Sequence, residues 1–397
     1  MRNKVVICIA LITSITIICS NEAKCQWEQT FWPLQLHCFG SLGSKIFAGA
    51  NGDSIKDGII VSTDNGNSWA IESGLINTQV NCLVSLGKYL IAGANGSIIR
   101  SSDSGTTWVN VLSNFPNATF SALATKGQKI FASAQGAIFR SGDSGATWIN
   151  PSNTFLPSIV VSLIANDNYL YAGTFDSGIY RSNDSDYNWE HLKSPCGECL
   201  LAGNGNNIFT NGIDSIYISS DNGTSWYPTS DIYASAHFTG QPAAIVAIGN
   251  DIFIGIQDEV GGIVLSTDLG QSWSEIGTMH LVNSLFIFGN YIFAGTNNTG
   301  LYRAKLSDFG IDAVIPSFLP GKQNFKLLSN PITSSADFQF DALKEPTVFE
   351  LFDALGRSVL RQQLPAGQAT LHVDMQKYPT GIYFARLSGN TVRVVKL

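Results

Sequence analysis

Six aspartates recur in one short pattern whose residue types could support chemistry or build a turn. Each stands two residues after a Ser and five before a Trp, and successive copies are 37 to 47 residues apart. They are Asp64, Asp103, Asp143, Asp184, Asp221 and Asp268. Carboxylates can serve as general acids or bases. In five copies, however, Gly follows two residues later and accepts positive φ while the carboxylate accepts backbone N–H bonds, so we expect tight structural turns.

A second candidate group surrounds the longest segment between repeats, where aromatic and polar residues gather. Its members are Tyr227, Tyr233, His237, Phe238, Asp258, Glu259 and His280. Ring faces stack on sugars and on flat peptide backbones, so these residues predict a rim that binds a glycan or an extended peptide. The alternative is that Tyr233 and Phe238 only pack the loop down. The histidines alone do not indicate a metal site.

The sequence offers no clear carboxylate pair for glycoside hydrolysis, which needs two acids about 5 to 9.5 Å apart. Asp258 and Glu259 are adjacent in one loop, and Asp53, Asp57 and Asp176 lie in other repeats with nothing to pair them. We therefore expect no catalytic residues, no metal and no cofactor. If the protein is an enzyme, a glycoside hydrolase is the class to test.

The elements that position these residues are short strands. Before the aspartate at position 103, three hydrophobic runs cover residues 81–86, 89–94 and 97–100, and Gly87-Lys88 and Asn95-Gly96 separate them as hairpin turns. The aspartate pattern is then the third turn of a four-stranded antiparallel blade, and its Trp opens the fourth strand. The pattern resembles the Asp-box repeat of sialidase-like and related β-propellers, and its period is that of a propeller blade.

The blade count predicts how the ring closes. A seventh copy of the three hydrophobic runs, at residues 283–303, is not followed by a Trp. Trp27, however, stands eleven residues before Cys38, and Trp189 and Trp273 stand at the same distance before the matching positions of the next blades. Residues 26–30 should therefore supply the missing strand, which removes both free sheet edges. We predict an all-β fold: a seven-bladed β-propeller of four-stranded antiparallel blades, followed by an immunoglobulin-like β-sandwich.

Strand order places the aspartate turns on one face of the propeller and the loops between blades on the other. We expect any ligand on the loop face. Resemblance to sialidases implies an arginine triad near the axis, but Arg100, Arg140, Arg181 and Arg303 all stand at the end of a third strand, a repeat position. That placement argues against sialidase chemistry.

The cysteines suggest structural roles. Cys38 and Cys82 stand at a position that holds a small residue in most blades, which predicts buried small side chains on the innermost strand. A disulfide between these two neighbouring blades is the alternative. Cys196 and Cys199 form the only Cys-x-x-Cys, and a zinc site would need a second pair or two histidines. A local disulfide is expected in an exported protein, with a free pair as the alternative.

Composition and the N-terminus indicate export. The formal net charge is −7 and only 13% of residues are charged, so no basic stripe exists for nucleic acid. Arg2 and Lys4 precede an apolar run over 5–19 that predicts a signal peptide, residues 1–25, cleaved after Ser20 or Cys25. We predict no transmembrane span in the mature chain.

The segment after residue 310 departs from the repeat. Residues 311–322 form a linker containing Pro and Gly, and residues 323–397 contain seven short β-like runs that fit a small sandwich. The motifs of this segment resemble the type A C-terminal sorting domain of the type IX secretion system of Bacteroidetes; they include Asn330, Pro331, Asp353, Gly356, Gly381 and Tyr383. A generic immunoglobulin-like binding module is the alternative.

That resemblance implies Sec export to the periplasm, recognition by the type IX secretion machinery, and delivery to the cell surface or the medium. Our leading hypothesis is an exported, non-catalytic propeller that binds protein or carbohydrate, similar in blade chemistry to photosystem assembly-factor propellers. The rival is a glycoside hydrolase of the sialidase-like or xyloglucanase-like type.

Overall fold

The computed structural model of the chain divides into two units, Met1–Val314 and Ile315–Leu397. Each is described by itself. The structure describes residues 17–18, 26–31, 35–51, 58–71, 78–113, 115, 118–150, 156–183, 188–204, 207–212, 215–233, 240–258, 261–297, 299–311, 325–328, 332–343, 346–353, 358–387 and 390–396.

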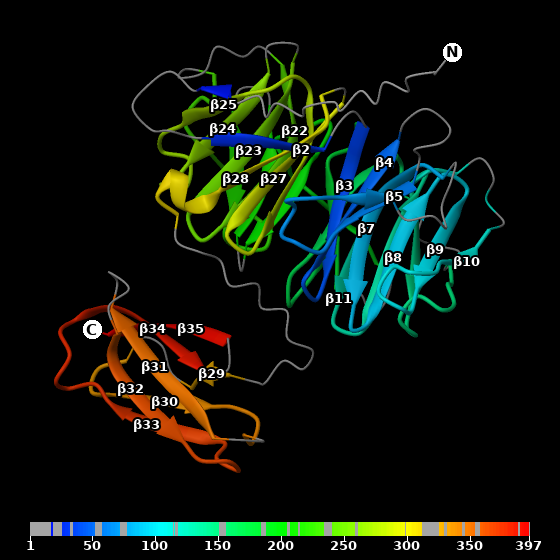
Figure 1. Ribbon diagram of the computed structural model, residues 1–397. Coiled ribbons are helices and arrows are strands. Elements are labelled where there is room, and N and C mark those ends of the chain that lie inside the picture. Colours follow the sequence, from blue (N-terminus) through cyan, green and yellow to red (C-terminus); the bar gives the residue numbers. More distant parts are fainter. Residues whose placement is uncertain are drawn as a thin grey trace, which may run out of the picture. The chain divides into compact units, whose positions relative to one another are not determined.

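The described part of the first unit holds seven antiparallel sheets, which are the seven blades of a β-propeller (Figure 1). Blade one is β3 (Gln35–Leu42), β4 (Lys45–Asn51), β5 (Gly58–Ser62) and β6 (Ala70–Ile71). Blade two is β7 (Val80–Leu86), β8 (Tyr89–Ala94), β9 (Ser97–Ser101) and β10 (Val109–Leu112). Blade three is β11 (Phe120–Lys126), β12 (Lys129–Ala134) and β13 (Ala137–Ser141).

Blades four to seven continue the same order. Blade four is β14 (Val160–Ala165), β15 (Leu170–Thr174), β16 (Ile179–Ser182) and β17 (Glu190–Leu192). Blade five is β18 (Leu201–Asn204), β19 (Asn207–Asn211), β20 (Ile216–Ser219) and β21 (Tyr227–Pro228). Blade six is β22 (Gln241–Ile248), β23 (Asp251–Gln257), β24 (Gly262–Ser266) and β25 (Ser274–Thr278). Blade seven contains β26 (Val282–Phe288), β27 (Tyr291–Thr296) and β28 (Leu301–Lys305), and the short helix η1 (Leu306–Phe309) follows it.

The first strands of neighbouring blades contact one another in a closed circle that runs β3, β7, β11, β14, β18, β22, β26 and back to β3. They are therefore the innermost strands of the ring. Blade three alone lacks a regular fourth strand among the described residues, where the single bridge between Arg140 and Ile149 takes its place. In blades one, two, four, five and six the turn Trp directly precedes the fourth strand rather than opening it.

The ring closes through the N-terminal strand, as predicted. Strand β2 (Gln26–Phe31) pairs antiparallel with β28 from the far end of the propeller (Figure 1). Trp27 is 1% exposed, and its indole N–H donates to the carbonyl of Ile276 in blade six at 2.9 Å. Glu28 accepts from the guanidinium of Arg303 at 2.9 Å. The two-residue strand β1 (Ile17–Ile18) pairs with the outer edge of β2.

The second unit is a sandwich of two antiparallel sheets. One contains β29 (Lys326–Leu327), β30 (Ser335–Gln339) and β33 (Thr370–Asp374), and the other contains β31 (Thr347–Asp353), β32 (Ser358–Leu364), β34 (Gly381–Leu387) and β35 (Asn390–Lys396). All seven predicted strands are present. Their core is formed by buried side chains such as Phe338, Phe349 and Leu351.

Candidate functional site

The aspartate turns share one hydrogen-bond pattern in the five copies that the structure describes. In the turn Ser62–Trp69, the two Asp64 oxygens accept from the backbone N–H of Ser68 at 2.9 Å and from its hydroxyl at 2.6 Å. The Ser62 hydroxyl donates to Asp64 at 2.8 Å and accepts from the N–H of Gly66 at 2.8 Å. The turns of Asp103, Asp143, Asp221 and Asp268 repeat these bonds, and Asp184 lies outside the described residues.

These bonds fix the protonation state of the turn carboxyls. The side-chain and backbone hydrogen bonds from Ser68 lower the pKa of Asp64 to about 2. The equivalent Thr or Ser lowers the pKa of Asp103, Asp221 and Asp268 to about 2, and that of Asp143 is also about 2 although its partial burial opposes the shift. A general acid needs a raised pKa, so the shift is opposite to the one such catalysis requires.

The recurring arginines join neighbouring blades through the aspartate turns. Arg100 of blade two donates to the carbonyl of Ser144 in the turn of blade three at 2.8 Å. Arg181 donates to Asn222 at 2.7 Å, and Arg303 donates to Asn65 at 2.8 Å across the ring closure. The sequence reveals the repeat of these arginines but not their partners, because each partner belongs to the following blade.

The glycine of each turn also serves the junction between blades. Gly66 has φ +77°, and a Cβ placed on it would lie 2.2 Å from the ring of Phe293 in blade seven. Gly105 repeats the arrangement against Phe47 of blade one, at 2.5 Å. The turn therefore needs Gly both for its backbone conformation and for the close approach of the neighbouring blade.

Parts of the predicted rim meet on the opposite face. The Tyr233 hydroxyl donates to the carbonyl of Gly240 at 2.8 Å, and its ring packs against the core between blades five and six. A Cβ on Gly240 would lie 2.6 Å from the Cβ of Asp258. The backbone carbonyl of Asp258 accepts the N–H of Leu281, the residue after His280, at 3.0 Å. Tyr233, Asp258 and the chain at His280 thus converge around Gly240.

The other predicted rim residues are distributed differently. Tyr227 is 64% exposed, and its hydroxyl accepts from Ser225 within the aspartate turn of its own blade, so it lies at the turn end of blade five. His280 is exposed. His237, Phe238 and Glu259 lie outside the described residues.

A recurring feature of the innermost strands could not be found from sequence alone. Six of the seven first strands contain a β-bulge at the same register, opposite the end of the second strand. The bulged residues are His37, Asn81, Ser121, Val161, Ala243 and Asn283. A bulge re-aims a side chain and is common beside functional sites. Detecting one requires the pairing of two strands, which a periodic pattern does not supply.

In four blades the residue after the bulge, Cys38, Cys82, Ser162 or Ser284, donates to a carbonyl of the next blade, which favours a small side chain there. The thiol of Cys82 donates to the carbonyl of Phe120 at 3.4 Å, and the Ser162 hydroxyl donates to Cys199 at 2.8 Å. Cys82 is buried, as predicted, whereas Cys38 is half-buried, and both thiols are free. Burial raises the pKa of Cys38 to about 12.

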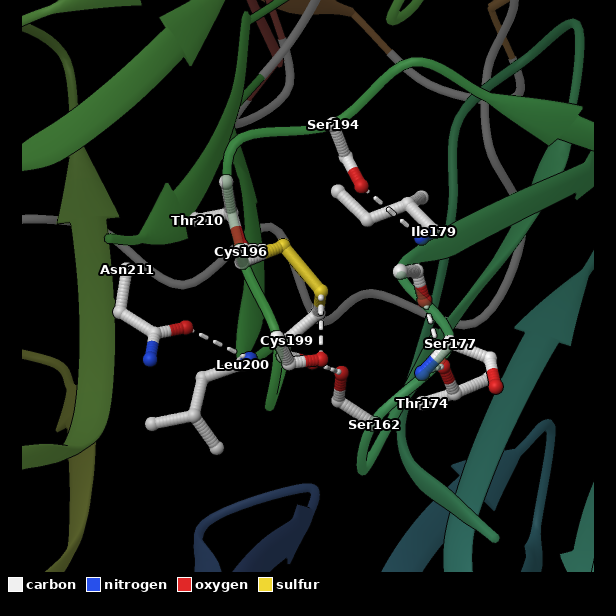
Figure 2. The surroundings of a disulfide bond; sticks show 12 residues. Ser162, Thr174, Ser177, Ile179, Ser194, Cys196, Cys199, Leu200, Thr210 and Asn211 are labelled. Carbon is white, nitrogen blue, oxygen red and sulfur yellow. Dashed lines mark hydrogen bonds between the residues drawn. A yellow bond between two sulfur atoms is a disulfide. The ribbon is translucent and has the colours of Figure 1, made fainter. Parts of the chain in front are cut away.

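Blade five begins with a disulfide where a bulge would stand. Cys196 and Cys199 are bonded to each other, so the predicted local disulfide is present. The Thr210 hydroxyl donates to the sulfur of Cys196. The carboxamide of Asn211 accepts the N–H of Leu200 at 2.9 Å, a bond that can be followed in Figure 2. The crosslink thus fixes the chain just before β18.

Neither metal binding nor membrane crossing is indicated in the described part of the chain. It contains no group of three or more His, Cys, Asp or Glu side chains arranged to hold a metal ion. None of its helical segments has the length and apolar character that crossing a bilayer requires.

In the C-terminal unit, the three predicted motif residues that the structure describes lie in paired strands. Tyr383 is buried in β34, opposite Asp353 of β31, and its hydroxyl donates to the carbonyl of Pro379 at 2.6 Å. Gly381 begins β34 opposite Lys396. Asn330, Pro331 and Gly356 lie outside the described residues.

Comparison with protein families gives this unit a role. Residues 328–397 match the secretion system C-terminal sorting domain. The chain therefore carries a type IX secretion signal at its C-terminal end, as its motifs predicted. Such a domain implies export, followed by secretion or attachment to the cell surface. A search of curated proteins found no significant match.

Solved structures share the propeller fold. YCF48 bound to D1 peptide matches with a TM-score of 0.57 and 13% identity, covering 73% of this chain and 99% of that one. The extracellular domain of BT4673 from B. thetaiotaomicron matches with a TM-score of 0.58 and 14% identity, covering 93% and 52%. An ancestral GH74 enzyme matches with a TM-score of 0.58 and 16% identity, covering 76% and 52%. At these identities the likeness is one of fold.

Proposed function

We propose that this protein is an exported, non-catalytic β-propeller that binds an extracellular protein or carbohydrate through its loop face. The observation that carries the proposal is the match of residues 328–397 to secretion sorting domains, because a chain with this signal acts outside the cell. The propeller is then the cargo, and its face of loops between blades is available to a ligand.

The aspartate turns support a binding role rather than catalysis. We interpret them as Asp-boxes, in which each carboxylate organises its own turn and is held ionised by hydrogen bonds. The arginines that a sialidase would place at its axis instead reach the turn of the next blade, as Arg100 and Arg181 do. The aspartates thus hold their own turns, and the arginines join neighbouring blades.

Residues near the loop face support a ligand there. Tyr233 and Asp258 approach each other around Gly240, and we propose that Asp258 contributes to a rim whose further members are His237, Phe238, Glu259 and His280. Among proteins of similar fold, one structure is of YCF48 bound to D1 peptide, and an ancestral GH74 enzyme represents the glycoside hydrolase alternative.

The proposed route of delivery has two steps. Residues 1–25 act as a signal peptide for Sec export, and the segment from about residue 323 is then recognised by the type IX machinery. Residues 26–310 form the propeller domain that is carried, and residues 311–322 link it to the sorting domain.

Fractionation tests this route. In a host with the type IX machinery, removal of residues 323–397 should leave a folded propeller in the periplasm, whereas the full chain reaches the surface or the medium. Fusion of the same segment to an exported reporter should carry the reporter out. A truncated chain that still reaches the medium would overturn the sorting assignment. Hydrolysis of glycan substrates by the purified protein would replace the binding role with the glycoside hydrolase alternative.

A further inference from the structure

Three consecutive blades place polar side chains at the same point of their innermost strands. Asn283 of β26, His37 of β3 and Asn81 of β7 are the bulged residues of blades seven, one and two. These strands are neighbours in the ring, so the three residues lie on one side of its axis. The bulge of blade three carries Ser121, whose hydroxyl donates to the carbonyl of Val160 in blade four at 2.6 Å. The bulges of blades four and six carry Val161 and Ala243. The bulge is thus a repeated backbone feature whose side chain varies from one side of the ring to the other.

Asparagines at the ends of the second strands extend this polar region. Asn297 and Asn95 directly follow the second strands of blades seven and two, whereas Phe175 takes the equivalent place in blade four. In blade two the amide groups are joined: Asn81 donates to Asn95 at 3.1 Å, and Asn95 donates to the Gln79 side chain at 2.9 Å. We call Asn283, His37, Asn81 and Asn95 the polar sector.

The imidazole of His37 is incompletely satisfied in the described structure. Its Nε2 atom is buried and has no hydrogen-bond partner among the described residues. Burial lowers the pKa of His37, so the ring is neutral at neutral pH and offers one donor and one acceptor. Buried polar atoms normally have partners, and an unpaired one is expected to meet water or a ligand.

The polar sector has the chemistry of a site for uncharged hydroxyl groups. Carboxamides and a neutral imidazole both donate and accept, as a sugar hydroxyl does. A charged ligand would lose its hydration without gaining a counter-charge from these four side chains. An extended peptide would add to a regular strand edge, but the bulges interrupt the ladder at this point.

We propose that the polar sector binds a neutral carbohydrate, with the carboxamides of Asn283 and Asn81 hydrogen-bonding its hydroxyl groups and the neutral imidazole of His37 lying between them in the ring. This inference rests on the proposed binding function and specifies its ligand class. Phe175, 53% exposed at the equivalent position of blade four, provides an aromatic face on the same end of the ring.

The test uses the secreted full-length protein on three arrays: neutral oligosaccharides, sialylated or uronic-acid glycans, and peptides. We expect binding to at least one neutral oligosaccharide. Calorimetry with that oligosaccharide should then show affinity at least ten-fold weaker for the double variant Asn81→Ala, Asn283→Ala. The matched control is Asn110→Ala, which removes an exposed, hydrogen-bonded carboxamide from the outermost strand of blade two and should leave affinity unchanged. If the double variant fails to fold, Asn283→Ala alone is measured and should also weaken binding.

Other outcomes overturn the inference in separable ways. Neutral oligosaccharide binding that a folded double variant retains would contradict the polar sector as the site while leaving the proposed function standing. Binding restricted to peptides or charged glycans would contradict the ligand class, again without removing a binding role. Binding on none of the arrays would contradict the proposed function and the inference together.

Discussion

The two ends of each blade, the end with the aspartate turn and the end with the loops between blades, differ in what repeats from blade to blade. At the turn end, five described copies repeat both residues and geometry, with the aspartate accepting a hydroxyl at 2.5 to 2.6 Å in every copy. At the loop end the bulge recurs in six blades, but its residue changes from Asn81 to Val161 to Ala243. The turn residues and their hydrogen bonds are thus held constant from blade to blade, whereas the residue at the bulge differs.

This difference separates stability from recognition. The turn end supplies the contacts that close the ring, including the hydrogen bond from Arg303 of blade seven to Asn65 of blade one. At the loop end the backbone is rigid but the side chains differ from blade to blade, which is the usual arrangement for binding sites on a stable scaffold. Changes at the turn end should therefore cost stability, and changes at the loop end should alter binding alone.

Removing the closing strand should have the largest effect. Deletion of residues 26–30 exposes the edge of β28, removes buried Trp27 and leaves the carboxylate partner of Arg303 missing. We expect the free energy of unfolding to fall by more than about 4 kcal/mol, since replacing a buried Trp by Ala alone costs about 3–5 kcal/mol. Urea unfolding of the purified propeller measures it. Unchanged stability would contradict closure through the N-terminus.

Glycine substitutions should separate packing between blades from backbone strain. Gly66→Ala brings a Cβ to 2.2 Å from Phe293 at φ +77° and should cost about 3 kcal/mol. The matched control, Gly87→Ala, has φ +59° with nothing within 4 Å of the added Cβ, so it should cost only about 1 kcal/mol of backbone strain. Equal losses in thermal or urea unfolding would show that the turn glycines do not serve the blade junction.

Sequence reasoning predicted the elements that repeat and missed those that depend on pairing. Trp27 revealed the closing strand because its spacing to the next blade repeats that of Trp189 and Trp273. The bulge at His37 was invisible, since it exists only in the register between two strands. The partner of Arg100 was missed for a similar reason, because the contact crosses from one blade to the next.

Acid should weaken the turn end. The aspartate pKa values of about 2 lie below the ordinary value of 3.8, so the turns contribute stability that is complete above about pH 4 and is lost as the pH falls from 3.8 towards 2. Asp64→Asn should cost about 1 kcal/mol at pH 7, since the side chain is solvent-exposed, and should reduce the acid-induced loss. Thermal melts between pH 7 and pH 2 measure both effects. An identical pH profile for the variant would contradict this role.

The smallest stability effect is expected at the loop end. Phe175 is 53% exposed and Ile159 is 52% exposed; they are joined by a backbone bond of 2.9 Å from the Phe175 N–H to the Ile159 carbonyl. Phe175→Ser keeps that bond and loses a side chain already half in water, so stability should change by less than about 0.5 kcal/mol. Thermal unfolding of Phe175→Ser and of Gly66→Ala, measured side by side, compares the two losses of stability. A loss above about 1.5 kcal/mol would mean that the loop end, like the turn end, is held by its side chains, and the division between a structural face and a recognition face would fail.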